Sequence, residues 1–142
     1  MSPKLYPYIF TIVFVVMCAT AFRSVEKNPR VTRYASITGL KAEKVAYYKN
    51  LHAEAWPAVL RKIKACHIRN YSIFLKEVDG KFFLFSYFEY VGRDFKLDMQ
   101  KMADDPETQR WWKETDPCQQ PLPDAQEKGE IWSAMDEVFH VD

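Results

Sequence analysis

The sequence has almost no excess of charge of either sign, with a formal net charge of +1, and this balance excludes one class of partner. Its 142 residues include 20 Lys and Arg against 19 Asp and Glu. A nucleic-acid-binding domain normally carries a basic patch or stripe that neutralises phosphates. No such stripe occurs here, so we expect no nucleic-acid partner. The chain also lacks internal repeats and low-complexity segments, which argues against repeat architectures.

Cysteine is scarce, with three residues in the chain: Cys18, Cys66 and Cys118. There is no CxxC pair, and the spacing fits no zinc template, so the sequence predicts no metal site. We interpret Cys66 and Cys118 as ordinary buried thiols. A disulfide between them is the alternative.

The longest hydrophobic run lies at the N-terminus, over residues 5–22 (LYPYIFTIVFVVMCATAF). It follows Lys4 and contains a small-residue triplet, Ala-Thr-Ala, that ends at Ala21. This combination predicts a signal peptide over residues 1–21, a linker over residues 22–30, and export to the periplasm or the extracellular space. The run is also long enough to span a bilayer, and the basic residues after it favour a cytoplasmic location for that side. An uncleaved membrane anchor is therefore the alternative.

Two later segments are predicted to form a β-hairpin around Asp79-Gly80. This dipeptide is a strong hairpin signal because both residues tolerate positive φ. A two-residue loop pairs Val78 with Lys81 and Phe74 with Phe85. Both faces of this ribbon are mostly apolar, so the face that helices leave open needs a second subunit or further helices against it.

The rest of the pattern predicts one α+β domain over residues 31–142, a ferredoxin-like split βαβ fold. We expect a four-stranded antiparallel sheet with helices on one face, as in dimeric α/β barrels. Strands are predicted at Val31–Gly39, Asn70–Val78, Lys81–Tyr90 and Glu137–Val141. Helices are predicted at 42–53, 57–66 and 94–103, and from Pro106 onward after an Asp105 cap. Residues 116–129 hold three prolines and a glycine and are predicted to be a loop. We expect a homodimer that hides the open face of the sheet.

The most informative stretch carries Tyr48, His52 and Trp56 at intervals of four residues. Residues four apart on a helix lie on one face. A phenol and an imidazole buried in an apolar stripe need polar partners. Pro57 disfavours helical geometry at the preceding residue, so we expect one helix to end near Ala53 and another to begin at Pro57. His52 is therefore a candidate catalytic residue beside a helix break, and a purely structural histidine is the alternative.

A second candidate is the pair Trp111 and Trp112. Consecutive helical residues point about 100° apart, so both cannot face the core, and at least one lies at a rim or in a cleft. Indoles and phenols near a histidine suit a small ring-shaped ligand, above all a sugar. The candidate sugar-binding residues are these two tryptophans with Tyr48 and Tyr71, around His52.

Four motifs, in this order, resemble the L-rhamnose mutarotase family. They are His52-x-x-x-Trp56-Pro57 with Tyr48 four residues earlier, Asn70-Tyr71-x-Ile73, Gln109-Arg110-Trp111-Trp112-Lys113, and Glu137-Val138-Phe139. The resemblance runs from about Arg33 to His140. It implies a dimeric ferredoxin-like α+β barrel that interconverts the anomers of L-rhamnose without a metal or a cofactor.

The resemblance also implies a role for each candidate residue. His52 corresponds to the family's proton donor, and Tyr48, Tyr71, Trp111 and Trp112 correspond to residues that bind the sugar. Mutarotation removes the proton of the anomeric hydroxyl, protonates the ring oxygen, and then closes the ring on the other face. One or two acid–base groups, each giving about 10²–10⁴-fold, are sufficient. We therefore expect a cofactor-independent aldose mutarotase for L-rhamnose or a related deoxysugar.

Three other functions are compatible with the same residues. The first is a sugar-binding module without catalysis. The second is an oxygenase or haem-handling protein of the same architecture. The third is an interaction protein tethered by its N-terminal segment, whose pocket its own side chains fill. The chain departs from the family in the residues before Val31 and in the Pro-rich segment 116–129.

Overall fold

The computed structural model describes residues 30–141. The predicted signal peptide or anchor at 1–21 lies outside the described residues, as does nearly all of the linker at 22–30. Their interpretation stays a prediction. Within residues 30–141, no helix has the length and apolar character needed to cross a membrane.

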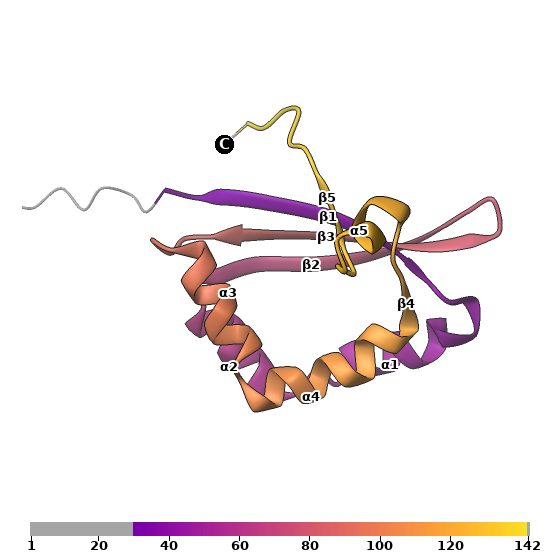
Figure 1. The fold of residues 1–142 in the computed structure, drawn as a ribbon, viewed down its shortest axis with the longest axis horizontal. Coiled ribbons are helices and arrows are strands. Elements are labelled where there is room, and N and C mark those ends of the chain that lie inside the picture. The colour runs from indigo at the N-terminus through magenta and orange to yellow at the C-terminus, as the bar shows by residue number, and fades with distance from the viewer. Residues whose placement is uncertain (1–29, 142) are drawn as a thin grey trace, which may run out of the picture.

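An antiparallel sheet forms one layer of the domain, and helices cover one of its faces (Figure 1). Its strands are β1 (Thr32–Leu40), β2 (Ile68–Val78), β3 (Lys81–Tyr90), β4 (Gln119–Gln120) and β5 (Ser133–Met135). The central order is β2-β3-β1, and both β4 and β5 pair with the other edge of β1. The predicted α+β class and the split βαβ order are confirmed.

The helical layer begins with a 3₁₀ turn, η1 (Ala42–Lys44), that leads into α1 (Val45–Ala53). It continues with α2 (Pro57–Ala65), α3 (Phe95–Ala103) and α4 (Pro106–Thr115). The predicted break is present, because Trp56 is extended, with ψ of 130°, and Pro57 is the first residue of α2. The predicted cap is also present, since the Asp105 carboxylate accepts a hydrogen bond from the Thr108 backbone N–H at 2.9 Å.

The hairpin has the predicted register, in which Val78 pairs with Lys81 and Phe74 with Phe85. Two clusters form the core between sheet and helices. One contains Leu40, Tyr48, Leu84 and Cys118, and the other contains Cys66, Ile68, Tyr90 and Met102. The two cysteines are thus free, buried thiols in different clusters.

Two predictions about the C-terminal part are wrong. Segment 116–129 is not a plain loop, because it folds into η2 (Asp116–Cys118), β4 and α5 (Pro123–Glu127). The last strand is β5 and not Glu137–Val141, so two short strands take the place of the predicted fourth. A hydrogen bond from Ser133 Oγ to Asp124 Oδ1 at 2.7 Å ties the start of β5 to α5. The apolar residues after β5 are exposed to solvent, and Val138 is 95% exposed. Because little of their surface is buried, their β-propensity alone does not produce a strand.

Candidate active site

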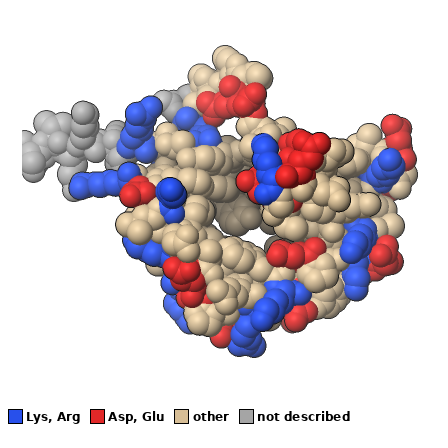
Figure 2. Space-filling model, viewed as in Figure 1, with Lys and Arg blue, Asp and Glu red and all other residues tan. Residues whose placement is uncertain are grey.

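A cavity of about 730 Å³ lies between the sheet and the helical layer. Its walls come from α1, α2, β2 and α4, and include Tyr48, His52, Ile63, Tyr71 and Trp111. A second space of about 620 Å³ shares several of these residues, so the two are parts of one hollow. Figure 2 shows the hollow opening between the two layers, with charged side chains interspersed around it. A mostly apolar cleft with a few polar groups is typical of a small-molecule site.

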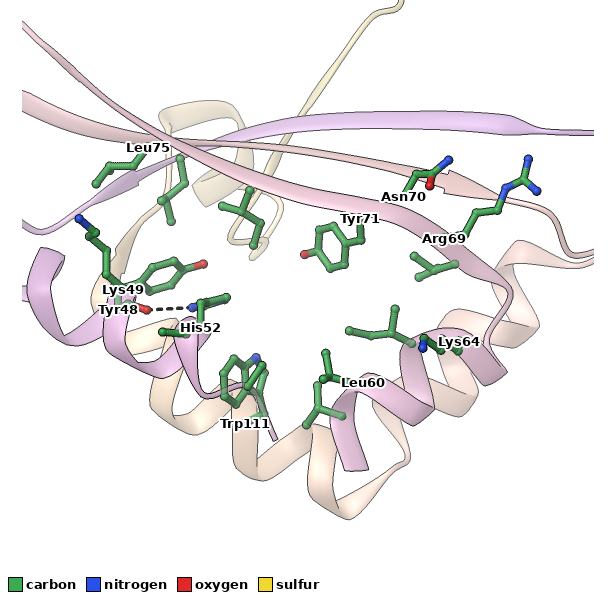
Figure 3. Close-up of a pocket in the computed structure, with 17 residues that line it drawn as sticks. Tyr48, Lys49, His52, Leu60, Lys64, Arg69, Asn70, Tyr71, Leu75 and Trp111 are labelled. Atoms are coloured by element: carbon green, nitrogen blue, oxygen red, sulfur yellow. Dashed lines mark hydrogen bonds between the residues drawn. The ribbon is translucent and has the colours of Figure 1, made fainter. Parts of the chain in front are cut away.

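His52 lies in the last turn of α1, where its ring faces the cavity (Figure 3). Its Nδ1 is 2.9 Å from the backbone carbonyl oxygen of Tyr48. Because a carbonyl oxygen can only accept, Nδ1 carries the proton and Nε2 is the atom left for a ligand. Burial lowers the pKa of His52 below its usual 6.5, which favours the neutral imidazole near pH 7.

The ring of His52 is held between two aromatic side chains. Tyr48 stacks on it with ring centroids 4.2 Å apart, and Trp111 meets it edge-on at 5.1 Å. Trp56 contacts Trp111 in turn, at 5.4 Å. Of the residues predicted to lie on one face, His52 and Trp56 both contact Trp111. Trp56, however, precedes α2 and is not part of α1.

Tyr48 is a buried phenol, 4% exposed, whose hydroxyl accepts a hydrogen bond from Gln119 Nε2 at 3.3 Å. Burial raises the pKa of Tyr48 far above its ordinary value. The phenol therefore keeps its proton near neutral pH. Since its oxygen accepts from Gln119, its own proton is free to be donated to a ligand.

Tyr71 enters the cavity from β2, on the sheet side, and Figure 3 shows its hydroxyl directed toward the region of Tyr48 and His52. It is 43% exposed, yet desolvation raises its pKa. Both observations are compatible because Tyr71 lines the hollow, where neighbouring side chains surround its ring. Tyr71 is therefore a neutral hydroxyl group placed opposite the histidine.

The two adjacent tryptophans of α4 have different surroundings. Trp111 is 7% exposed and forms part of the cavity wall. Trp112 is 36% exposed and lines the second space. The prediction that both could not be core residues is confirmed, and the structure brings both to one hollow with His52, Tyr48 and Tyr71.

Sequence reasoning missed the residues that the Pro-rich segment contributes. Asp116, Gln119, Glu130 and Trp132 line the second space, all within or just after the stretch predicted as a loop. Burial raises the pKa of the Asp116 carboxyl group. No periodicity marks these residues, because β4 is only two residues long and prolines interrupt the segment. Over residues 30–141, no three His, Cys, Asp or Glu side chains gather in a way that could hold a metal ion.

Comparison with known proteins agrees with this geometry. A family model described as L-rhamnose mutarotase matches residues 33–141. L-rhamnose mutarotase from Bacillus subtilis is 34% identical over 110 residues, which cover 78% of this chain and 98% of that protein. The protein of the same name from Listeria monocytogenes is 35% identical over 109 residues, covering 77% and 97%.

A solved structure shares the fold. The crystal structure of an L-rhamnose mutarotase from Formosa agariphila superimposes with a TM-score of 0.58, at 24% identity, over 78% of this chain and 99% of that one. The order of strands and helices, the family model and the two bacterial relatives all agree with the four motifs read from the sequence. The chain belongs to the L-rhamnose mutarotase family.

Proposed function

We propose that this protein is a cofactor-independent mutarotase that interconverts the α and β anomers of L-rhamnose or a related deoxysugar. The name of the curated relatives supports L-rhamnose as the substrate. The observation that carries the proposal is the free Nε2 of His52, which faces a hollow lined by phenols and indoles.

The reaction needs one proton to leave and one to arrive. On ring opening, the C1–O5 bond breaks, the anomeric hydroxyl loses its proton as C1–O1 becomes a carbonyl, and O5 gains a proton. We assign the transfer to O5 to His52 in its protonated form, whose Nε2 gives its proton to O5 and takes it back when the ring closes. The proton of the anomeric hydroxyl passes to water during opening and returns from water during closure. Burial of this imidazole lowers its pKa and makes the protonated form a stronger acid.

The other residues hold the sugar in place. The neutral phenols of Tyr48 and Tyr71 bind hydroxyl groups, since both keep a proton to donate. Trp111 and Trp112 pack against the apolar face of the pyranose. Desolvation inside the hollow strengthens each of these hydrogen bonds relative to the same contact in water.

Saturation transfer between the α and β anomeric NMR signals of L-rhamnose tests the proposal, because exchange is measured at equilibrium. Wild-type protein should speed exchange, and His52→Asn should reduce the enzymatic rate by about 100-fold or more. His67→Asn is the matched control, since this histidine does not line the cavity. A folded His52→Asn protein with wild-type exchange would contradict the assignment. Sugar binding without faster exchange would favour the non-catalytic module.

We also infer that the protein acts as a homodimer that packs the uncovered faces of two sheets together. Leu84 and Ser86 are buried beneath the helices, so Phe85, between them on β3, faces the opposite side. Phe85 pairs there with Phe74 on β2 and Ile37 on β1, and Phe74 is 62% exposed. An apolar strip of this kind across three strands supports association.

A further inference from the structure

Strand β2 contains one extra residue opposite β3. Arg69 pairs with Glu89, but the next regular pair is Ser72 with Tyr87. Two residues, Asn70 and Tyr71, therefore lie opposite a single position of β3. Asn70 has a positive φ of 49°, which asparagine tolerates better than most residues. This is a β-bulge, and bulges redirect the side chains that follow them.

The bulge decides which way Tyr71 points. Residues two apart in a regular strand share a face, so Tyr71 would lie on the same face as Arg69. Because Asn70 is inserted between them, the alternation shifts by one residue. Figure 3 shows the result: Tyr71 points into the cavity, whereas Arg69 and Asn70 contribute to its edge and direct the polar ends of their side chains away from its centre. Ile73, two residues later, also lines the cavity, so the shift persists along the strand.

Glu89 holds the bulge from the face opposite the cavity. Its Oε2 accepts a hydrogen bond from Arg69 Nε at 2.8 Å, and its Oε1 accepts from the Tyr87 hydroxyl at 3.3 Å. Hydrogen bonds from the side chains of Asn70 and Arg69 lower the pKa of Glu89, so the carboxylate stays charged. The Glu89 carboxylate therefore accepts hydrogen bonds from Arg69 and Tyr87 and lies close to the side chain of Asn70, beside the two residues that precede Tyr71.

We propose that Asn70 is a positioning residue of the sugar site: the bulge it forms, clamped by Glu89, turns the Tyr71 hydroxyl into the cavity and so sets its contact with the sugar. This role rests on the proposed function, since it concerns the same site. Asn70 itself acts through Tyr71 and needs no contact with the substrate.

Two substitutions at Asn70 separate backbone geometry from side-chain loss. Asn70→Val disfavours positive φ, whereas Asn70→Gly accepts it freely. We expect Asn70→Val to raise KM for L-rhamnose about tenfold with little change in kcat. Asn70→Gly keeps the positive φ but loses the side chain next to Glu89, so it should raise KM clearly less than Asn70→Val does. Asp79→Val is the matched control, because Asp79 has the same φ of 49° but lies in the hairpin turn. It should lower Tm and leave KM unchanged.

A double-mutant cycle tests whether Asn70 acts through Tyr71. In a Tyr71→Ala background, Asn70→Val should raise KM no further, since the hydroxyl it positions is gone. An equal rise in both backgrounds would overturn the proposal, and so would a wild-type KM for folded Asn70→Val. If Asn70→Val does not fold, Asn70→Ala, which strains the backbone less, takes its place in the same cycle.

Fluorine NMR gives a readout that does not depend on activity. With 3-fluorotyrosine incorporated, Tyr71→Phe identifies the Tyr71 signal by its loss. That signal should move to a solvent-exposed shift in Asn70→Val and stay in place in Asn70→Gly; an unmoved signal in Asn70→Val would overturn the proposal. If the wild-type protein failed to speed anomer exchange while the signal moved as expected, the proposed function would fail and the positioning of Tyr71 would stand.

Discussion

The imidazole of His52 is bound to the backbone of Tyr48, the residue one helical turn earlier, through an Nδ1–carbonyl distance of 2.9 Å. The two rings also stack, with centroids 4.2 Å apart. A single spacing of four residues therefore fixes the tautomer of the histidine and the direction of its ring. It leaves Nε2 as the atom that can exchange a proton with a bound sugar.

The first prediction is the direction of the pH dependence. Burial lowers the pKa of His52 below 6.5, so the protonated donor form is lost as pH rises through that lowered value. The value of kcat/KM, corrected for the uncatalysed rate, should therefore fall with rising pH between about pH 5 and pH 8. Saturation-transfer rates measured across this pH range give kcat/KM. His52→Asn is the control, because its residual rate should not show this fall with rising pH. A rise with pH over the same range would assign His52 as a base in the free enzyme.

The second prediction distinguishes the paired tryptophans. Trp111 is 7% exposed and supports His52 and Trp56, so Trp111→Ala should destabilise the fold by about 3 kcal/mol and also weaken sugar binding. Trp112 is 36% exposed, so Trp112→Ala should raise KM several-fold with a much smaller fall in Tm. Thermal melts and KM values measured on the same samples decide the matter. Equal losses of Tm would contradict the different placement of the two rings.

The third prediction concerns Gln119, whose amide donates to the hydroxyl of Tyr48. Gln119→Met keeps the volume and removes this donor, so kcat/KM should fall about fivefold, the size of one neutral hydrogen bond. Gln120→Met is the matched control, because Gln120 is the next residue of β4 and is exposed. Combining Gln119→Met with Tyr48→Phe should give less than the sum of the two losses, and full additivity would count against a role through Tyr48.

The structural elements that were predicted correctly from the sequence are those whose conformation is determined by neighbouring residues in the chain. Pro57 cannot continue the helix before it, Asp105 caps α4 with its own side chain, and Asp79-Gly80 accepts the positive φ angles of the turn. In each case the residues that determine the structure are adjacent in sequence. The errors fall where contacts between distant segments decide. Strand β4 exists only because Gln119 and Gln120 meet Leu40 and Gly39.

The site shows the same division. The helical spacing identified Tyr48 and His52, and the adjacency of Trp111 and Trp112 showed that one must face a cleft. The direction of the Tyr71 side chain could not be predicted from the sequence. Regular alternation places Tyr71 on the same face of β2 as Arg69, and only the bulge at Asn70 moves it to the opposite face. The family resemblance supplied the predicted role of Tyr71 in sugar binding, and the structure shows how its side chain is directed into the cavity.

The fourth prediction tests the homodimer. Phe74→Lys places a charge in the middle of the uncovered sheet face, where Phe74 is 62% exposed and pairs with Phe85. Wild-type chain from Arg30 onward should sediment as a dimer at micromolar concentration, and the variant should sediment as a monomer. Lys76→Phe is a reciprocal control, since it extends the apolar strip on the same strand and should leave the dimer intact. A monomeric wild type would contradict the inference.

The fifth prediction concerns a buried carboxylate outside the cavity. Asp98, 3% exposed, accepts hydrogen bonds from Lys101 Nζ at 2.9 Å, from the Tyr90 hydroxyl at 2.8 Å and from His67 Nδ1 at 2.8 Å. These hydrogen bonds lower the pKa of Asp98 from 3.8 to about 2. The bond from Lys101 has the largest effect, and the bond from Tyr90 the next largest. The network joins α3 to the end of β3 and the turn before β2, so it ties three elements together.

Because the folded pKa lies below the unfolded one, the carboxylate stabilises the fold above about pH 4 and loses this effect as pH falls toward 2. Asp98→Asn should therefore lower Tm by roughly 5 °C or more at pH 7, and the difference from wild type should shrink as the wild-type carboxyl group is protonated. Asp104→Asn, an exposed carboxylate at the end of the same helix, is the matched control and should change Tm little. Anomer exchange per folded molecule should stay unchanged in both variants, because neither side chain lines the hollow. A Tm difference for Asp98→Asn that stayed constant down to pH 2 would show that the charge of this carboxylate does not stabilise the fold.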